Sequence, residues 1–152
     1  MSTFVPASHV LLDQSAGSVD EALRLLASRA VELGLASDAD AVYEAFKARE
    51  SEGTTGMTGG FAIPHAKSDA ITEAGIIVLK FAEGIEWPAM DDAPVTCAIS
   101  ILTPASEAGT THLQLLSKVA VLLMNDGFRT SVQGATDADK IAALIDEGLN
   151  EA

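Results

Sequence analysis

Apolar residues recur along the chain with two different spacings, and this predicts helices alternating with strands. The clearest helical spacing, three or four residues, lies between Ser18 and Leu33. Ser18 and Glu21 form a capping-box pattern at its start, and Gly34 follows its last apolar residue. The apolar stripe of this helix consists of Val19, Ala22, Leu23, Leu26, Ala30 and Leu33.

Three further segments repeat the helical spacing. The first covers 39–49. The second covers 111–124, where apolar residues are too numerous for a half-exposed helix, so we expect it to be central and largely buried. The third covers 136–149 and is predicted to end at Gly148. The inward-facing residues of the first segment are Val42, Tyr43 and Phe46. Those of the third are Ile141, Leu144 and Ile145.

Short runs rich in branched apolar residues predict strands at 9–12, 75–81 and 94–102. In the last of these, alternate residues are predicted to share one face, and they are Val95, Cys97, Ile99 and Ile101. The residues of the opposite face are mostly smaller. Alternating helices and buried strands predict an α/β fold in which helices cover both faces of a sheet. No linker or repeat divides residues 1–152, so we expect a single compact domain.

Composition narrows the class of protein. The chain has 152 residues, of which 48% are hydrophobic and 5% aromatic, so aliphatic side chains and alanine must build its core. Its net charge of −13 argues against nucleic-acid binding, because a phosphate backbone would be repelled. No leader pattern and no apolar stretch of membrane-spanning length is present, so we expect no membrane insertion and a cytoplasmic location.

His65 is the first candidate for chemistry. An apolar run ending in Pro64 and His65 places an imidazole at the mouth of a strand, where solvent and a partner can reach it. Its ring nitrogen can take a proton, a metal or a phosphoryl group, while the other nitrogen keeps a hydrogen bond. A plain loop or core histidine is the alternative. Four glycines close before it favour function, since they allow tight turns and close approach: Gly53, Gly56, Gly59 and Gly60.

His112 is the second candidate, because Thr111 and Gln114 resemble a capping box that places it in the first turn of a helix. Free backbone N–H groups and the helix dipole favour an anion there, so this imidazole could help to hold a phosphoryl group. A partly buried histidine paired with a carbonyl fits the same position. The spacing leaves both interpretations open.

Competing chemistries have weaker support. The glycine segment lacks the Lys-Ser/Thr ending of a nucleotide-binding loop, and the three histidines show no metal-ligand spacing, so we expect neither a cofactor nor a metal. The single cysteine, Cys97, lies in an apolar strand and is predicted to be a core residue. Trp87 and Met90 are predicted to be packing residues.

Three separated segments resemble the fructose-mannitol class of enzyme IIA of the bacterial sugar phosphotransferase system. They are 56–65 (GMTGGFAIPH), 87–95 (WPAMDDAPV) and 112–120 (HLQLLSKVA). The resemblance implies a mixed sheet and a cytoplasmic phosphoryl carrier. It implies that His65 accepts a phosphoryl group from the carrier protein HPr and passes it to a cysteine of an enzyme IIB. It further implies that His112 supports the phosphorylated ring and that Arg49 lies near it.

Several alternatives stay open at this point. Arg49 could be an ordinary arginine at a helix end, where a cation meets the negative end of the dipole. Ala66 stands where family members often have glycine, which matters only if the position needs a positive backbone angle. The chain could belong to the regulatory, nitrogen-linked branch of the family, or it could be a binding module that is never phosphorylated. The sequence does not identify the sugar.

Overall fold

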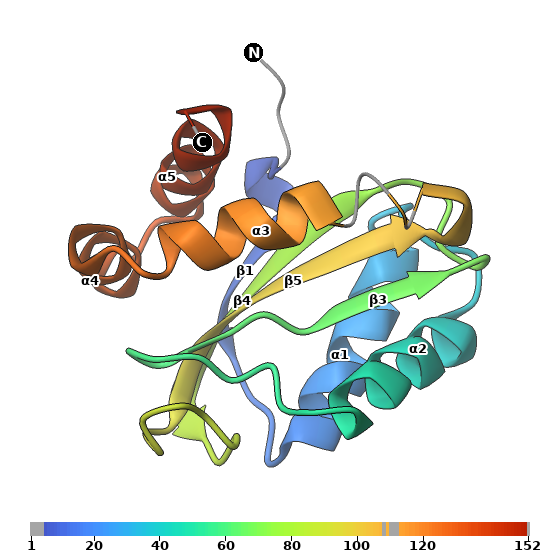
Figure 1. Ribbon diagram of the computed structural model, residues 1–152, viewed down its shortest axis with the longest axis horizontal. Helices are drawn as coiled ribbons and strands as arrows, with labels where there is room; N and C mark the ends of the chain where they lie inside the picture. The colour runs from blue at the N-terminus through green and yellow to red at the C-terminus, as the bar shows by residue number, and fades with distance from the viewer. Residues whose placement is uncertain (1–4, 108, 110–112, 152) are drawn as a thin grey trace.

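The computed structural model describes residues 5–107, 109 and 113–151, and a five-stranded mixed sheet runs through its centre (Figure 1). The strands are β1 (Val10–Gln14), β2 (Phe61–Ala62), β3 (His65–Ser68), β4 (Gly75–Ile85) and β5 (Val95–Pro104). β1 pairs with β4 in parallel, and β4 pairs with β5 antiparallel. β2 and β3 pair in parallel with β5 in one common register, Phe61 opposite Cys97 and His65 opposite Ile101. The mixed sheet expected from the resemblance is therefore confirmed.

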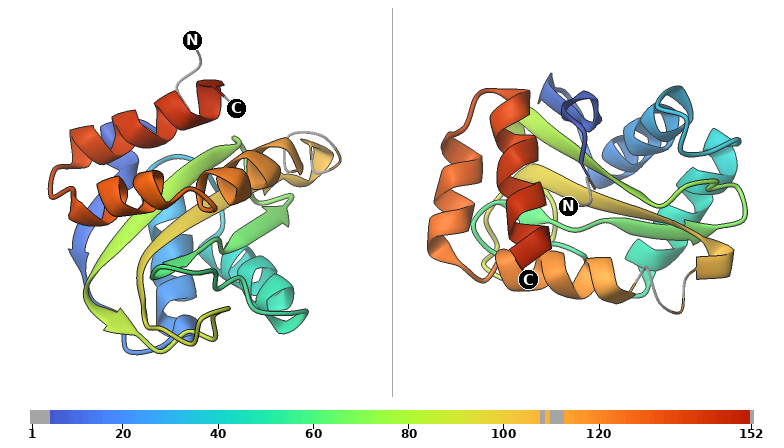
Figure 2. Two further views of the ribbon diagram at one scale, coloured as in Figure 1. Left: turned by 60° about the vertical axis from the view of Figure 1, so that its left-hand side comes forward. Right: turned by 90° about the horizontal axis from the view of Figure 1, so that it is seen from above.

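Helices cover both faces of the sheet, as predicted (Figure 2). α1 (Val19–Glu32) and α2 (Ala39–Ser51) pack on one face. α3 (Leu113–Leu122), α4 (Asp126–Gly134) and α5 (Ala138–Glu151) pack on the other. Two 3-10 turns complete the described elements, η1 (Ala7–His9) before β1 and η2 (Ala105–Glu107) after β5.

The predicted caps of α1 are present with one difference. The Ser18 hydroxyl accepts a hydrogen bond from Glu21 N at 3.2 Å, and Gly34 has φ of +80° just beyond the helix. The Glu21 carboxylate, however, accepts from Gly17 N at 3.1 Å and not from Ser18 N. Both ends of the helix are thus fixed by the residues that the sequence indicated.

The predicted face of β5 is wrong at one residue. Cys97, Ile99 and Ile101 pack on the side of α3 to α5, but Val95 packs on the opposite side. The amides of Thr96 and Cys97 both donate to Gly60 O, at 2.8 and 3.0 Å, as in a β-bulge. The extra residue reverses the alternation of side chains between the two faces of β5. The spacing of apolar residues in the sequence does not predict it.

The prediction that the helix near 111–124 is largely buried is also wrong. Within α3 only Leu115 and Val119 are buried, whereas Leu113 is 58% exposed and Val121 61% exposed. Met124, just beyond the helix, is 76% exposed. The helix lies on the outside of the sheet, and no helix or strand among the described residues covers its outer face (Figure 2). Apolar residues on its outer face therefore meet solvent, although their number suggested a core helix.

Gly148 does not end the last helix, because α5 continues to Glu151. A Cβ atom at Gly148 would lie 2.7 Å from Leu122 Cδ2, so glycine allows α5 to approach α3 closely. Ile141 and Ile145 are fully buried as predicted, whereas Leu144 is only half-buried.

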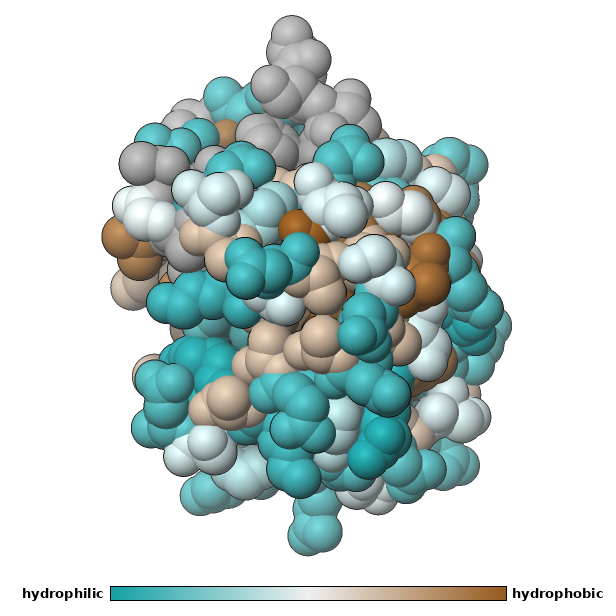
Figure 3. All heavy atoms as spheres, turned by 90° about the vertical axis from the view of Figure 1, so that its right-hand side faces the viewer, coloured by the Kyte–Doolittle hydropathy of each residue, from teal (hydrophilic) through white to brown (hydrophobic). Residues whose placement is uncertain are grey.

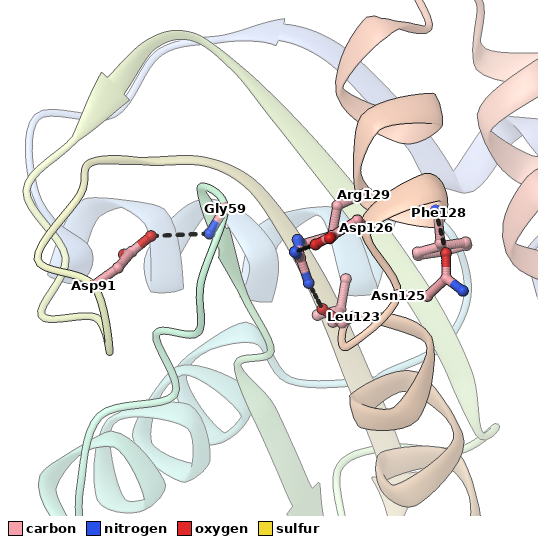
Figure 4. A network of polar contacts seen from close by, with 7 residues as sticks. All are labelled: Gly59, Asp91, Leu123, Asn125, Asp126, Phe128 and Arg129. Atoms are coloured by element: carbon pink, nitrogen blue, oxygen red, sulfur yellow. Dashed lines mark hydrogen bonds and ion pairs between the residues drawn. The ribbon is translucent and has the colours of Figure 1, made fainter.

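α4 was not predicted, since only Val132 of its residues is buried and its apolar pattern is short. Asn125 caps it by accepting from Phe128 N at 2.8 Å (Figure 4). At its other end the Lys80 ammonium donates to three carbonyl oxygens, those of Val132, Gln133 and Ala135, at 3.1, 2.9 and 3.0 Å. One cation of β4 thus ties α4 to the sheet.

On the face at the right of Figure 1, hydrophilic residues surround a smaller number of apolar ones (Figure 3). Across the described ranges, no helix is both long and apolar enough to pass through a membrane.

Replacing Lys80 by Met keeps an aliphatic stem and removes three charge-assisted hydrogen bonds. We expect the free energy of unfolding to fall by about 2 kcal/mol, because hydrogen bonds to charged groups contribute about 1.5–3 kcal/mol. Urea unfolding followed by circular dichroism measures it, with the exposed Lys140→Met as the control. Equal stability of the two variants would show that the Lys80 bonds contribute nothing.

Candidate functional site

His65 is the first residue of β3, and both of its ring nitrogens have partners. Nδ1 lies 2.8 Å from Ile63 O, and Arg49 Nε donates to Nε2 at 2.9 Å. A carbonyl oxygen can only accept and a guanidinium can only donate. The proton therefore belongs on Nδ1, and Nε2 carries a lone pair.

Burial favours the neutral form of this ring. His65 is 6% exposed, and desolvation is the main cause that lowers its pKa below the ordinary 6.5. The positive charge of Arg49 acts in the same direction, while the hydrogen bond to Ile63 O and the carboxylates of Glu50 and Glu52 oppose it. The sequence predicted a ring open to solvent, but here the side chain is buried and Arg49 bonds to Nε2.

Arg49 belongs to the last turn of α2, and its guanidinium is bound at two points. Nε meets His65, and Nη1 donates to Gly53 O at 2.8 Å. The structure thus brings together Arg49 and His65, which the resemblance placed near each other. His112, the third predicted site residue, lies outside the described residues.

The sequence analysis missed Glu50. Its Oε2 accepts from Thr55 N at 2.8 Å and from Trp87 Nε1 at 3.2 Å, and its Oε1 accepts from Thr55 Oγ1 at 2.6 Å. Thr55 and Trp87 are 5% and 3% exposed, so these donors lie away from solvent. Trp87 is therefore a packing residue, as predicted, that also donates a hydrogen bond. Met90 is 72% exposed, and its predicted packing role is wrong.

The glycine-rich segment before His65 is held against the 87–91 loop. A Cβ atom at Gly56 would lie 2.0 Å from Pro88 O, so only glycine allows this approach. Gly59 has φ of +70°, and its amide donates to Asp91 Oδ2 at 3.0 Å (Figure 4). This hydrogen bond is the main cause that lowers the pKa of Asp91. Two separate loops are thereby joined beside the site.

α4 also supports this segment. Gln133 Nε2 donates to Gly59 O at 2.9 Å, and Arg129 packs against Gly59. Arg129 donates to Leu123 O at 2.5 Å and pairs with Asp126 (Figure 4). The unpredicted helix thus contributes to the position of the glycine turn.

Other chemistry finds less support in these side chains. Cys97 is fully buried, and desolvation raises its pKa to about 12, which makes a thiolate inaccessible near neutral pH. In the part of the chain that the structure describes, no three His, Cys, Asp or Glu side chains gather to hold a metal ion. Ala66 has no positive φ, so the methyl group at this position is tolerated.

Comparison with known proteins identifies the family. Residues 3–148 match the family described as phosphoenolpyruvate-dependent sugar phosphotransferase system, EIIA 2. The chain is 35% identical over 147 residues to the PTS system fructose-specific EIIA component of Haloferax volcanii, covering 97% of this chain and 95% of that protein. It is 32% identical over 148 residues to the 2-O-alpha-mannosyl-D-glycerate-specific EIIABC component of Escherichia coli, covering 97% of this chain but only 22% of that longer protein.

Solved structures agree on the fold. Nitrogen regulatory protein IIA-Ntr from Neisseria meningitidis superposes with a TM-score of 0.85 at 28% identity, covering 93% of this chain and 96% of that one. IIA mannitol from Escherichia coli gives 0.77 at 21% identity, with coverage of 93% and 98%. The family predicted from three sequence segments is confirmed. Because the match extends over almost the whole length, this chain belongs to the EIIA 2 family of the sugar phosphotransferase system, whose members carry a phosphoryl group.

Proposed function

We propose that this chain, as one domain over residues 1–152, is a phosphoryl carrier of a sugar uptake system in the cytoplasm, and that His65 Nε2 is the acceptor atom. The observation that carries the proposal is the fixed state of the ring. Nδ1 faces a carbonyl oxygen and Nε2 faces a guanidinium, so the nucleophilic lone pair is on Nε2.

The transfer step balances without a base at Nε2. As the bond between phosphorus and Nε2 of His65 forms, the bond between phosphorus and the donor HPr breaks, and no proton has to leave Nε2. Nδ1–H keeps its hydrogen bond to Ile63 O and stabilises the charged ring. The phosphorus–nitrogen bond is then broken by a cysteine thiolate of an enzyme IIB, which returns the lone pair to Nε2.

Arg49 supplies the charge for this step. Its guanidinium has to leave the lone pair of Nε2 before phosphorus can bond there, and it stays within reach of the incoming oxygens because α2 ends beside the ring. A guanidinium offers paired donors to phosphoryl oxygens, where negative charge is distributed in the transition state. The support proposed for His112 rests on the family resemblance alone.

The sugar branch of the family is favoured by the fructose-specific relative, which the chain matches over nearly its whole length. That an enzyme IIB is the acceptor partner is supported by a solved complex of the mannitol IIA and IIB enzymes, one of which has this fold. That phospho-HPr is the donor rests on the family resemblance. A nitrogen-regulatory role is the second candidate. It is supported by the TM-score of 0.85 with a nitrogen regulatory protein and by 31% identity to another from Bradyrhizobium diazoefficiens.

Replacing His65 by Ala should abolish phosphorylation. We expect wild type to gain one phosphoryl group after incubation with phosphoenolpyruvate, the general phosphotransferase proteins and HPr, and the variant to gain none. Intact mass at alkaline pH, where phosphohistidine survives, measures it. His9→Ala removes a histidine of the η1 turn and should behave as wild type.

Loss of the phosphoryl group in both variants would mean that the fold, and not the acceptor, was damaged. No gain in wild type beside a working control acceptor would favour the unphosphorylated binding module. Onward transfer to a fructose-type enzyme IIB separates the two branches, because the sugar branch requires it and a purely regulatory protein does not.

Replacing Arg49 by Lys keeps the charge and loses the planar fork of donors. We expect transfer from phospho-HPr to slow by about a hundredfold, the effect of removing one preorganised donor to a developing negative charge. Rapid-quench kinetics measures it, and Arg29→Lys, in a surface ion pair, is the control. Equal transfer rates for Arg49→Lys and Arg29→Lys would show that Arg49 does not assist the transfer.

The lowered pKa of His65 predicts the pH dependence of phosphoryl acceptance. At pH 6.5 an ordinary histidine is half-protonated, whereas more than half of the His65 rings should still be neutral and reactive, and phosphoryl acceptance should fall as pH decreases further. As pH decreases from about 6.5 towards the lower pKa of the folded ring, the unfolded chain binds more protons than the folded one. The free energy of unfolding therefore falls as pH decreases through this range. Titration of the His65 ring by NMR measures the pKa. A midpoint at or above 6.5 would contradict the burial argument.

A further inference from the structure

The carboxylate of Glu50 joins two parts of the chain that flank the site. It follows Arg49 at the end of α2, and it accepts two hydrogen bonds from Thr55 and one from Trp87. Charge-assisted hydrogen bonds to a carboxylate are shorter and stronger than neutral ones. Thr55 is therefore fixed at both its amide and its hydroxyl group.

From Thr55 the hydrogen bonds continue to the ring of His65. Thr55 O accepts from Ile63 N at 3.0 Å, and Ile63 O lies 2.8 Å from His65 Nδ1. Thr55, Ile63 and His65 are 5%, 3% and 6% exposed, so water competes little for these bonds. A continuous path of four residues thus leads from Glu50 to the nitrogen opposite the acceptor atom.

This path matters because the segment that it holds, between α2 and β2, is rich in glycine. Gly53, Gly56, Gly59 and Gly60 lie between α2 and β2, and glycine loses more conformational freedom on folding than other residues. Thr55 is the residue of this segment that pairs with Ile63. If Thr55 shifts, the Ile63 amide loses its partner, and the Ile63 carbonyl can turn away from Nδ1. The ring can then exchange its proton between the two nitrogens.

We propose that Glu50 is a positioning residue for His65, which holds Thr55 and through it the Ile63 carbonyl, so that the ring proton stays on Nδ1 and Nε2 keeps its lone pair. The importance of this role rests on the proposed function, because only a nucleophilic His65 depends on its tautomer for activity. The tautomer itself does not depend on that function.

A direct effect of charge has to be separated from positioning. Both Glu50 and Glu52 raise the pKa of His65 through their negative charge, although burial outweighs them. Glu52 is exposed at the end of α2, so Glu52→Ala removes a similar charge without breaking the path. Glu50→Gln removes the charge but keeps an oxygen for the two N–H donors and an amide for the Thr55 hydroxyl group.

The test compares Glu50→Ala, Glu50→Gln and Glu52→Ala in the full chain. The ¹⁵N shifts of the His65 ring report the tautomer, and intact mass reports the rate of phosphorylation by phospho-HPr. We expect Glu50→Ala to show a mixture of tautomers and a rate about tenfold lower, the scale of losing an outer partner of a metal-bound histidine. Glu50→Gln and Glu52→Ala should keep the wild-type tautomer and a rate within about twofold of wild type.

An unchanged tautomer in folded Glu50→Ala, or the same shift in Glu52→Ala, would overturn the proposal. If Glu50→Ala does not fold, Thr55→Val takes its place, since it removes only the hydroxyl group bonded to Oε1. The same tautomer shift in that variant supports the path, and a wild-type spectrum overturns it. If wild type is never phosphorylated, the proposed function fails, while the NMR comparison still decides the role of Glu50.

Discussion

Two hydrogen bonds at the ring of His65 form the constraint on which the rest of the site depends. One nitrogen faces Ile63 O, which can only accept, and the other faces Arg49, which can only donate. Together they fix one tautomer, and burial favours the uncharged ring by lowering its pKa. A neutral ring with a defined lone pair is what nucleophilic attack on phosphorus requires.

The sheet supplies the place for this arrangement. β2 and β3 share one register along β5 and are interrupted at Ile63 and Pro64, where proline offers no amide to a ladder. This interruption lies at the edge of the sheet, so the glycine segment and the end of α2 can reach the ring there. Ile63 thereby bonds to Thr55 on one side and to His65 on the other.

Acidic residues act here in two different ways. The net charge of −13 is spread over the chain, and most of it concerns solubility and encounters with partners. Glu50, in contrast, accepts three hydrogen bonds from buried or backbone donors and acts on local geometry. Its neighbour Arg49 is a cation that donates to Nε2 of His65, so two adjacent residues of one helix end contact the two sides of this arrangement.

The sequence by itself determined the helices with a clear stripe and caps, the apolar strands, the family and the candidate pair of His65 and Arg49. Local spacing and side-chain chemistry are enough for the helices, the strands and His65, whereas the family and Arg49 came from the resemblance of three segments. Only the tertiary structure decided that the apolar helix α3 leaves one face exposed and that a bulge turns Val95 to the other side of β5. It also decided the tautomer of His65 and the hydrogen-bond partners of Glu50, because both depend on contacts that the local sequence pattern does not specify.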